Sequence, residues 1–252
     1  MTNILSFAPW REHFERNRRR RVPVPTSSSA LTRVQQDRLA WSLARFQIGE
    51  TGEGRIVAQI EKARLPGVDA DYRRALALFI AEEGRHAAIL ARLVRALGGE
   101  SLTSAWSERC FRSARRFFGV RFKLFVMFGA EVLGAGIYAT LAYALPADGS
   151  GMREALLEMA ADEHAHLLFH RHFFFLQLTT RWQRAAFSWA WGAMVRAAAI
   201  LAIWEHRRTF RALAIPLSSV WRNLADLRIA ARCFLSPNVR KVDVTATHQV
   251  ST

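Results

Sequence analysis

Cysteine is nearly absent from this sequence. Its 252 residues include two cysteines, Cys110 and Cys233, which lie far apart and outside any Cys-x-x-Cys motif. Without closely spaced cysteines the chain cannot build a rubredoxin-type iron centre or a zinc ribbon. So low a cysteine content is also typical of a reducing compartment, and it predicts a cytoplasmic protein.

Alternating runs of β-branched residues, which would indicate strands, are also missing, and helix-forming residues dominate. Hydrophobic residues make up 51% of the chain, which is enough for a sizeable core. We therefore predict an all-α protein whose length suits one large domain with appendages.

Acidic residues are scarce relative to basic ones. The chain has 21 Asp and Glu against 36 Lys and Arg, which gives a formal net charge of +15. Such a balance favours an anionic partner. We expect this partner to be an anionic membrane surface, with the protein peripheral at its inner face, or an acidic carrier protein. We expect no specific nucleic acid.

Residues 1–28 contain no apolar segment as long as the core of a signal peptide, so we expect no export. The arm is basic at Arg18–Arg21, and it is interpreted as disordered and solvated. The alternative is a basic anchor in which Phe7, Trp10 and Phe14 supply interfacial aromatic side chains.

Two Glu-x-x-His motifs stand out against this background. Glu83 and His86 form the first, and Glu163 and His166 form the second. A separation of three residues places both side chains of each motif on one face of a helix, one turn apart. A carboxylate and an imidazole in this arrangement can bind one metal ion, and carboxylate and imidazole ligands suit Fe(II) and Mn(II).

A lone glutamate lies about 30 residues upstream of each motif, at Glu53 and at Glu131. A helix-breaking sequence lies between each glutamate and its motif, at Pro66-Gly67 and at residues 146–151, so two helical hairpins are expected. Each glutamate and each motif lies roughly 20 Å from its turn at the helical rise of about 1.5 Å per residue. The two hairpins would thus bring four carboxylates and two imidazoles to one level.

The expected first helix spans about residues 30–65, and it offers two glutamates. Glu53 is centred on an apolar stripe, where a carboxylate is costly unless it is paired or bound to metal. Glu50 lies at the edge of that stripe and is the alternative ligand. Glu53 is preferred because its distance from the turn matches that of Glu83 better.

These motifs resemble those of the ferritin-like carboxylate-bridged di-iron superfamily. The stretch Glu53-Gly54-Arg55 resembles the first-helix ligand of rubrerythrin-type members. The stretches at 82–86 and 162–166 resemble the Asp-Glu-x-Arg-His motifs of di-iron monooxygenases and ribonucleotide reductase small subunits, although His164 and Ala165 depart from the pattern.

The resemblance implies a four-helix bundle of two hairpins over residues 29–180, joined by a long crossover at about 98–117. It implies two iron ions, Fe–Fe or alternatively Mn–Fe. Their expected ligands are Glu53, Glu83, His86, Glu131, Glu163 and His166.

Further polar residues are expected around these ligands. By the monooxygenase-like pattern, Asp162 should orient His86 and Glu82 should orient His166; solvent exposure is the equal alternative for Glu82. His170 lies one turn beyond His166, and we interpret it as a core or supporting histidine. A seventh-ligand role, as in p-aminobenzoate N-oxygenases, is less favoured because those enzymes carry a histidine where this chain has Met159.

The segment Leu124–Leu145 has Glu131 as its one carboxylate and is long enough to span a membrane. We prefer burial in the bundle, under two additional C-terminal helices expected within residues 181–235. The apolar stretch Ala185–Trp204 of these helices is expected to cover the bundle or contact a membrane. Residues 236–252 are predicted to be a disordered tail.

The function that the resemblance implies is an O2-activating oxygenase or oxidase. Apolar positions near the motifs (Phe79, Phe128, Met159, Leu167) predict a small apolar or aromatic substrate, and an electron donor protein would be required. A ferroxidase and a rubrerythrin-like peroxidase are alternatives. Another is a membrane-associated helical protein with a degenerate metal site. A radical-generating reductase is disfavoured, because Leu90 stands where that family has its tyrosine.

Overall fold

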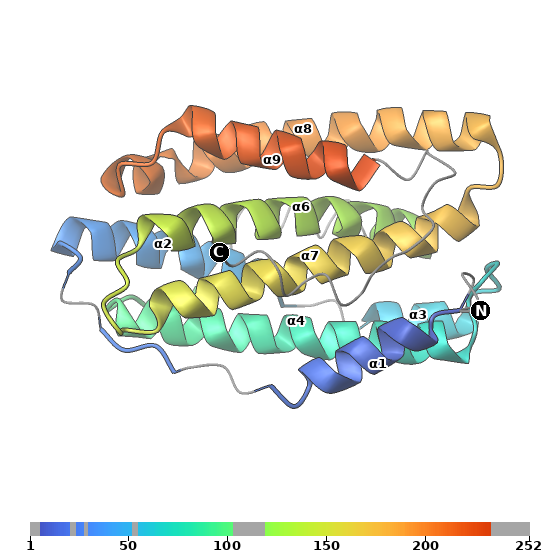
Figure 1. Ribbon diagram of the computed structural model, residues 1–252, viewed down its shortest axis with the longest axis horizontal. Helices are drawn as coiled ribbons and strands as arrows, with labels where there is room; N and C mark the ends of the chain where they lie inside the picture. The colour runs from blue at the N-terminus through green and yellow to red at the C-terminus, as the bar shows by residue number, and fades with distance from the viewer. Residues whose placement is uncertain (1–5, 21–23, 28–29, 52–54, 103–118, 233–252) are drawn as a thin grey trace.

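The protein is all-helical in the part of the chain that the structure describes. In this computed structural model the described residues are 6–20, 24–27, 30–51, 55–102 and 119–232, and they form helices without a strand (Figure 1). The predicted all-α class is therefore confirmed. The expected crossover falls mostly on residues 103–118 and the expected tail on 236–252, and both lie outside the described residues.

The first hairpin is built from α2 (Arg33–Gly49), α3 (Arg55–Lys62) and α4 (Ala70–Ala96). Asp69 caps α4 by accepting a hydrogen bond from the Tyr72 amide at 2.7 Å. The prediction of one continuous helix over 30–65 was wrong, because α2 ends at Gly49. The Thr51 hydroxyl, two residues beyond that end, donates a hydrogen bond to the Ile48 carbonyl at 2.7 Å. This bond satisfies a carbonyl in the last turn of the helix.

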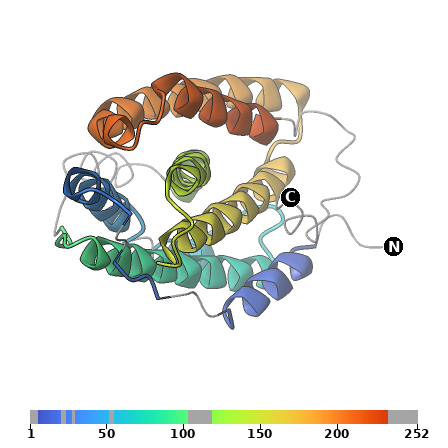
Figure 2. The ribbon, with the colours of Figure 1, turned by 60° about the vertical axis from the view of Figure 1, so that its left-hand side comes forward.

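The second hairpin is formed by α6 (Val120–Ala144) and α7 (Met152–Gln177), which lie on either side of the predicted break at residues 146–151. Their connection turns at Gly149 and Gly151, whose φ angles of 76° and 73° lie in the left-handed region that glycine adopts without strain. The two helices lie side by side along their length (Figures 1 and 2).

The C-terminal helices α8 (Arg181–Ala212) and α9 (Leu217–Arg232) form a layer over α6, on the side away from α4 (Figures 1 and 2). By length and composition α6 and α8 are both apolar enough to cross a membrane, which is weak evidence by itself. In α6, 72% of the apolar 18-residue stretch is buried, so that helix belongs to the core. In α8 the buried share is 28%, so most of its apolar stretch is either partly buried or exposed.

The N-terminal arm differs from the prediction of a disordered segment over residues 1–28. Residues Ala8–Asn17 form helix α1, which packs on α4 (Figure 1). Phe7, Trp10 and Phe14 are buried there, and Phe14 lies edge-on to Phe79 of α4 at 6.2 Å between ring centroids. The aromatic side chains that were considered as interfacial anchors are instead part of the core, because their burial on the bundle stabilises the helix.

The packing of α1 gives a testable expectation. The Trp10 side chain is 2% exposed and donates from Nε1 to His172 Nδ1 at 3.0 Å. Trp10→Phe should therefore lower the free energy of unfolding by about 1–2 kcal/mol. Trp182→Phe is the matched control, since Trp182 is 72% exposed and should shift stability by less than about 0.5 kcal/mol. Urea unfolding would measure both, and equal small effects would show that α1 contributes nothing to stability.

Candidate metal centre

Two helices bring the Glu-x-x-His motifs together in the interior. Glu83 and His86 come from α4, and Glu163 and His166 come from α7. One ligand atom from each residue can be chosen so that all four lie within 4.8 Å of one another, and all four side chains are buried. This group could hold a metal ion, as the helical spacing of both motifs predicted.

The two imidazoles reach across to the opposite helix. His86 Nδ1 lies 3.1 Å from Glu163 Oε1, and His166 Nδ1 lies 3.1 Å from Glu83 Oε1. The Nδ1 atoms thus face the carboxylates, while the Nε2 atoms point to other partners. If a metal ion binds here, Nδ1 is the nitrogen that each histidine has available.

Glu131 joins the same group from α6. Its side chain is buried, with Oε2 3.5 Å from His166 Nδ1 and Oε1 3.6 Å from His170 Nε2. The approach of α6 is close at Gly134, where an added Cβ would lie 3.1 Å from Glu163 Cδ. Because Gly134 has no side chain, it leaves room for the Glu163 carboxylate.

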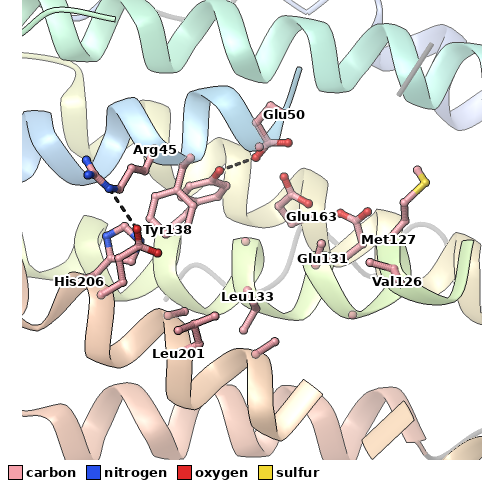
Figure 3. Close-up of a pocket in the computed structure, with 18 of the residues that line it drawn as sticks. Arg45, Glu50, Val126, Met127, Glu131, Leu133, Tyr138, Glu163, Leu201 and His206 are labelled. Atoms are coloured by element: carbon pink, nitrogen blue, oxygen red, sulfur yellow. Dashed lines mark hydrogen bonds and ion pairs between the residues drawn. The ribbon is translucent and has the colours of Figure 1, made fainter. Parts of the chain in front are cut away.

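The first hairpin contributes Glu50, the residue that follows the end of α2. Tyr138 of α6 donates its hydroxyl proton to Glu50 Oε1 (Figure 3). The same carboxyl group is hydrogen-bonded with Glu83. Glu53, the ligand preferred from the sequence, lies outside the described residues. Among the described residues near the end of α2, Glu50 is the glutamate that reaches the cluster. Its position at the edge of the apolar stripe was the sequence feature that indicated it as an alternative ligand.

A second set of charged groups holds the outer nitrogens of the two histidines. His86 Nε2 lies 3.3 Å from Asp162 Oδ2, and His166 Nε2 lies 3.1 Å from Glu82 Oε2. Both contacts are those predicted from the sequence, and Glu82 is buried rather than exposed to solvent. Such contacts fix the orientation of each ring and leave Nδ1 as the inward-facing nitrogen.

Two arginines that the sequence did not connect with the site complete this arrangement. Arg85 contacts both Glu82 and Asp162, the latter at 3.0 Å, and Arg20 contacts Asp162 at 3.0 Å. Arg20 was expected to lie in a disordered arm. The spacing of three residues between Glu82 and Arg85 was the available signal for Arg85, and nothing local indicated Arg20.

The inner carboxylates are held in a site that disfavours their charge. Burial raises the pKa of Glu50, Glu83 and Glu163, and the neighbouring carboxylates raise it further. Burial opposes protonation of His86 and His166, yet the surrounding carboxylates outweigh it and raise the pKa of both imidazoles well above the ordinary value. The site therefore favours added positive charge, which either protons on these groups or a bound cation can supply.

The outer groups have the opposite character. Although burial acts to raise the pKa of Asp162, its hydrogen bond with His86 and the charges of His86 and Arg20 hold that pKa at about 2. Asp162 is therefore ionised at neutral pH. Burial and the neighbouring His166 lower the pKa of His170 to about 3, so His170 is neutral and fits a supporting or core role.

Several buried polar atoms at the centre make no well-directed hydrogen bond. They are Glu83 Oε1, Glu163 Oε1 and His86 Nδ1, together with both ring nitrogens of His170. The first three still lie close to an oppositely charged partner, since His86 Nδ1 is 3.1 Å from Glu163 Oε1 and His166 Nδ1 is 3.1 Å from Glu83 Oε1. Because the first three face a common point, their donor chemistry fits a metal ion of the kind that carboxylates and imidazoles bind.

A cavity of about 200 Å³ adjoins the carboxylates between α2, α6 and α8. Figure 3 shows Glu50, Glu131 and Glu163 at one end of it and Arg45 and His206 at the other. Its wall is otherwise mostly apolar, with contributions from Phe46, Val126, Met127, Leu133, Met194, Ala198 and Leu201. The lining predicted from the sequence was wrong: Phe79, Phe128, Met159 and Leu167 are packed in the core instead.

The far end of the cavity carries a buried histidine with a consequence for stability. Burial, with a smaller contribution from Arg45, lowers the pKa of His206 to about 3. An unfolded histidine has a pKa of about 6.5, so the stability gained from neutral His206 is fully present above that pH and is lost as pH falls towards 3.

Substitution at this position should therefore change the acid dependence of unfolding. Between pH 7 and about pH 5.5 this one group should lower the unfolding free energy by about 1 kcal/mol. His206→Leu should remove that part of the pH dependence, and Ser42 would keep its hydrogen bond to Thr209 at 2.7 Å. Urea unfolding at both pH values measures it, and an unchanged pH dependence in the variant would contradict the assignment.

In comparisons with known proteins, the chain matches no family model, no curated protein and no solved structure. The functional argument therefore starts from the geometry of the centre and its cavity.

Proposed function

We propose that the centre binds two iron ions and that the protein is an O2-activating oxidoreductase of the ferritin-like di-iron type. In this proposal α2, α4, α6 and α7 are the four helices of the bundle, with α8 and α9 added to it. The observation that carries the proposal is the convergence of Glu83, His86, Glu131, Glu163 and His166 at one buried point.

The ligand set favours two metal ions over one. Four carboxylates and two imidazoles are the set that ferritin-like bundles use for a metal pair. Glu83 with His86 and Glu163 with His166 are the paired ligands, Glu131 is the third carboxylate, and Glu50 or Glu53 is the fourth. A bound di-iron pair, or a manganese–iron pair in its place, would supply the redox chemistry for O2 activation.

The protein's own residues have three roles in this proposal. Asp162 and Glu82 accept hydrogen bonds from the Nε2 sides of His86 and His166, which presents Nδ1 to the metal. Tyr138 donates to Glu50 and can hold or pass a proton at that carboxylate. The apolar wall of the cavity excludes water from the reacting substrate.

The cavity also indicates the substrate class. A volume of about 200 Å³ bounded by the carboxylates and by side chains such as Met127, Leu133 and Met194 suits a small apolar or aromatic molecule. No electron-transfer centre can be built from the two cysteines, so a separate electron donor protein would re-reduce the metal. A storage function is less favoured because it needs no apolar cavity beside the metal.

Metal analysis tests the proposal directly. The protein purified after anaerobic loading with Fe(II) should contain about two irons per chain, the number that this ligand set accommodates. Its optical spectrum should change on exposure to O2 and be restored by a reductant. Hundreds of irons in a cage-sized particle would assign the protein to storage, and absence of stoichiometric metal would favour the degenerate-site alternative.

A further inference from the structure

The layer formed by α8 and α9 exposes an unusual amount of hydrophobic surface. Six of the eleven strongly exposed large hydrophobic side chains in the described residues lie on these two helices. We call this surface the outer face, and its large hydrophobic residues are Trp182, Trp189, Ile200, Trp204, Trp221 and Ile229. Isolated exposed apolar residues are ordinary, but a set gathered on one layer marks an interaction site.

The exposed residues of α8 lie along one stripe. Trp182, Trp189, Ala193, Ile200 and Trp204 recur at helical spacing on the side turned away from the protein. The opposite side of the same helix packs on α6 and α2 and supplies part of the cavity wall. The helix therefore has one side in the fold and one apolar side without a partner in the described chain.

The charges of this helix are nearly all positive. It contains six arginines and one acidic residue, Glu205, which pairs with Arg45 of α2 at 3.1 Å. Two of the arginines lie next to the exposed tryptophans. The guanidinium carbon of Arg181 is 5.2 Å from the Trp182 ring centroid, and that of Arg207 is 4.5 Å from the Trp204 centroid.

Tryptophan beside arginine is the combination that favours the boundary between lipid headgroups and acyl chains. We propose that the outer face docks on an anionic lipid surface, with α8 lying in the plane of that surface. The net charge of +15 complements anionic headgroups, and each basic residue near such a surface adds to binding. The same density of arginine disfavours a second copy of this chain as the occupant.

The position of Arg196 separates lying on the membrane from crossing it. Arg196 is exposed midway along the apolar stripe, where a spanning helix would place it in the hydrocarbon. In the plane of the surface its side chain can reach the headgroups while the flanking tryptophans enter the acyl boundary. The packed inner side of α8 also prevents the helix from being surrounded by lipid.

Vesicle co-sedimentation of the full chain, without added metal, tests the proposal independently of any iron chemistry. The wild type should bind phosphatidylcholine vesicles that contain phosphatidylglycerol far better than phosphatidylcholine alone, and binding should weaken as salt rises and the Debye length falls to about 8 Å. A Trp189→Ser, Trp204→Ser double variant and an Arg208→Gln, Arg211→Gln double variant should each bind at least about tenfold more weakly.

Matched controls come from surfaces away from α8 and α9. Val24 is 67% exposed on the segment 24–27, which lies on the opposite side of the bundle from α8 (Figure 1), so Val24→Ser removes an exposed apolar side chain away from the outer face. Arg92→Gln with Arg95→Gln removes the same charge from exposed positions of α4, on the other side of the molecule (Figure 1). Both controls should bind vesicles within about twofold of wild type, since surface potential acts mainly within a Debye length.

Tryptophan quenching by lipids with brominated acyl chains reports the insertion itself. Fluorescence of the wild type should fall when it binds such vesicles, and the Trp189→Ser, Trp204→Ser variant should lose most of that quenching. Binding without quenching, or equal loss of binding in the controls, would overturn the proposal. So would a dimer in solution that the tryptophan variants dissociate and that binds no vesicle, because the face would then belong to a second copy.

Discussion

His166→Ala is expected to abolish stable iron binding, weakening it by at least about a hundredfold. His166 Nδ1 faces Glu83, Glu131 and Glu163 at 3.1, 3.5 and 3.4 Å, so its loss removes an imidazole nitrogen that contacts three carboxylates. Alanine leaves these carboxylates with their mutual repulsion and with one metal-binding nitrogen fewer. Iron per chain, measured after anaerobic loading and desalting, should fall from about two to below one.

His164→Ala is the matched control for this variant. His164 lies two residues away on the same helix but is exposed, so its loss should leave iron occupancy unchanged. Glu82→Gln separates positioning from ligation: the amide can still contact His166 Nε2, so binding should weaken by only about tenfold. Full iron occupancy in a folded His166→Ala protein would refute the assignment of the Glu-x-x-His pairs as ligands.

Gly134→Val is expected to be the most damaging substitution at a residue that donates no ligand atom. An added Cβ would already lie 3.1 Å from Glu163 Cδ and 3.2 Å from its Cγ, closer than carbon atoms normally pack. The two further methyl groups of valine must displace the Glu163 carboxylate or push α6 away from α7. Because metal sites tolerate little displacement of a ligand, iron affinity should fall about tenfold to a hundredfold.

The control for this steric argument is Gly84→Val. Gly84 is also a helical glycine beside a ligand, but an added Cβ there would meet no atom within 4 Å. Both variants carry the same change in helix propensity, so a difference between them measures the contact with Glu163. Iron titration of the two proteins, with circular dichroism to compare helicity, provides the test. Equal affinities would show that the approach of α6 does not shape the site.

The sequence by itself determined the local features of this protein. The breaks before α4 and between α6 and α7 could be predicted because proline and glycine act on the backbone over a few neighbouring residues. The pairing of Glu83 with His86 and of Glu163 with His166 followed for the same reason, since the rise of a helix fixes which side chains share a face. The equal distance of both motifs from their turns also brought the two pairs to one level.

Only the tertiary structure decided which residues from distant parts of the chain surround the two Glu-x-x-His pairs. Glu50 reaches the cluster because α2 ends at Gly49, just before it, and because the Tyr138 hydroxyl of α6 donates a hydrogen bond to its carboxylate. Arg20 reaches Asp162 because α1, which the sequence alone left disordered, gains enough burial on α4 to hold its place. The exposed side of α8 cannot pack on the bundle, because the opposite side of that helix is the one in contact with α6. Each of these outcomes depends on contacts between residues far apart in the chain, where helical periodicity carries no information about the partner.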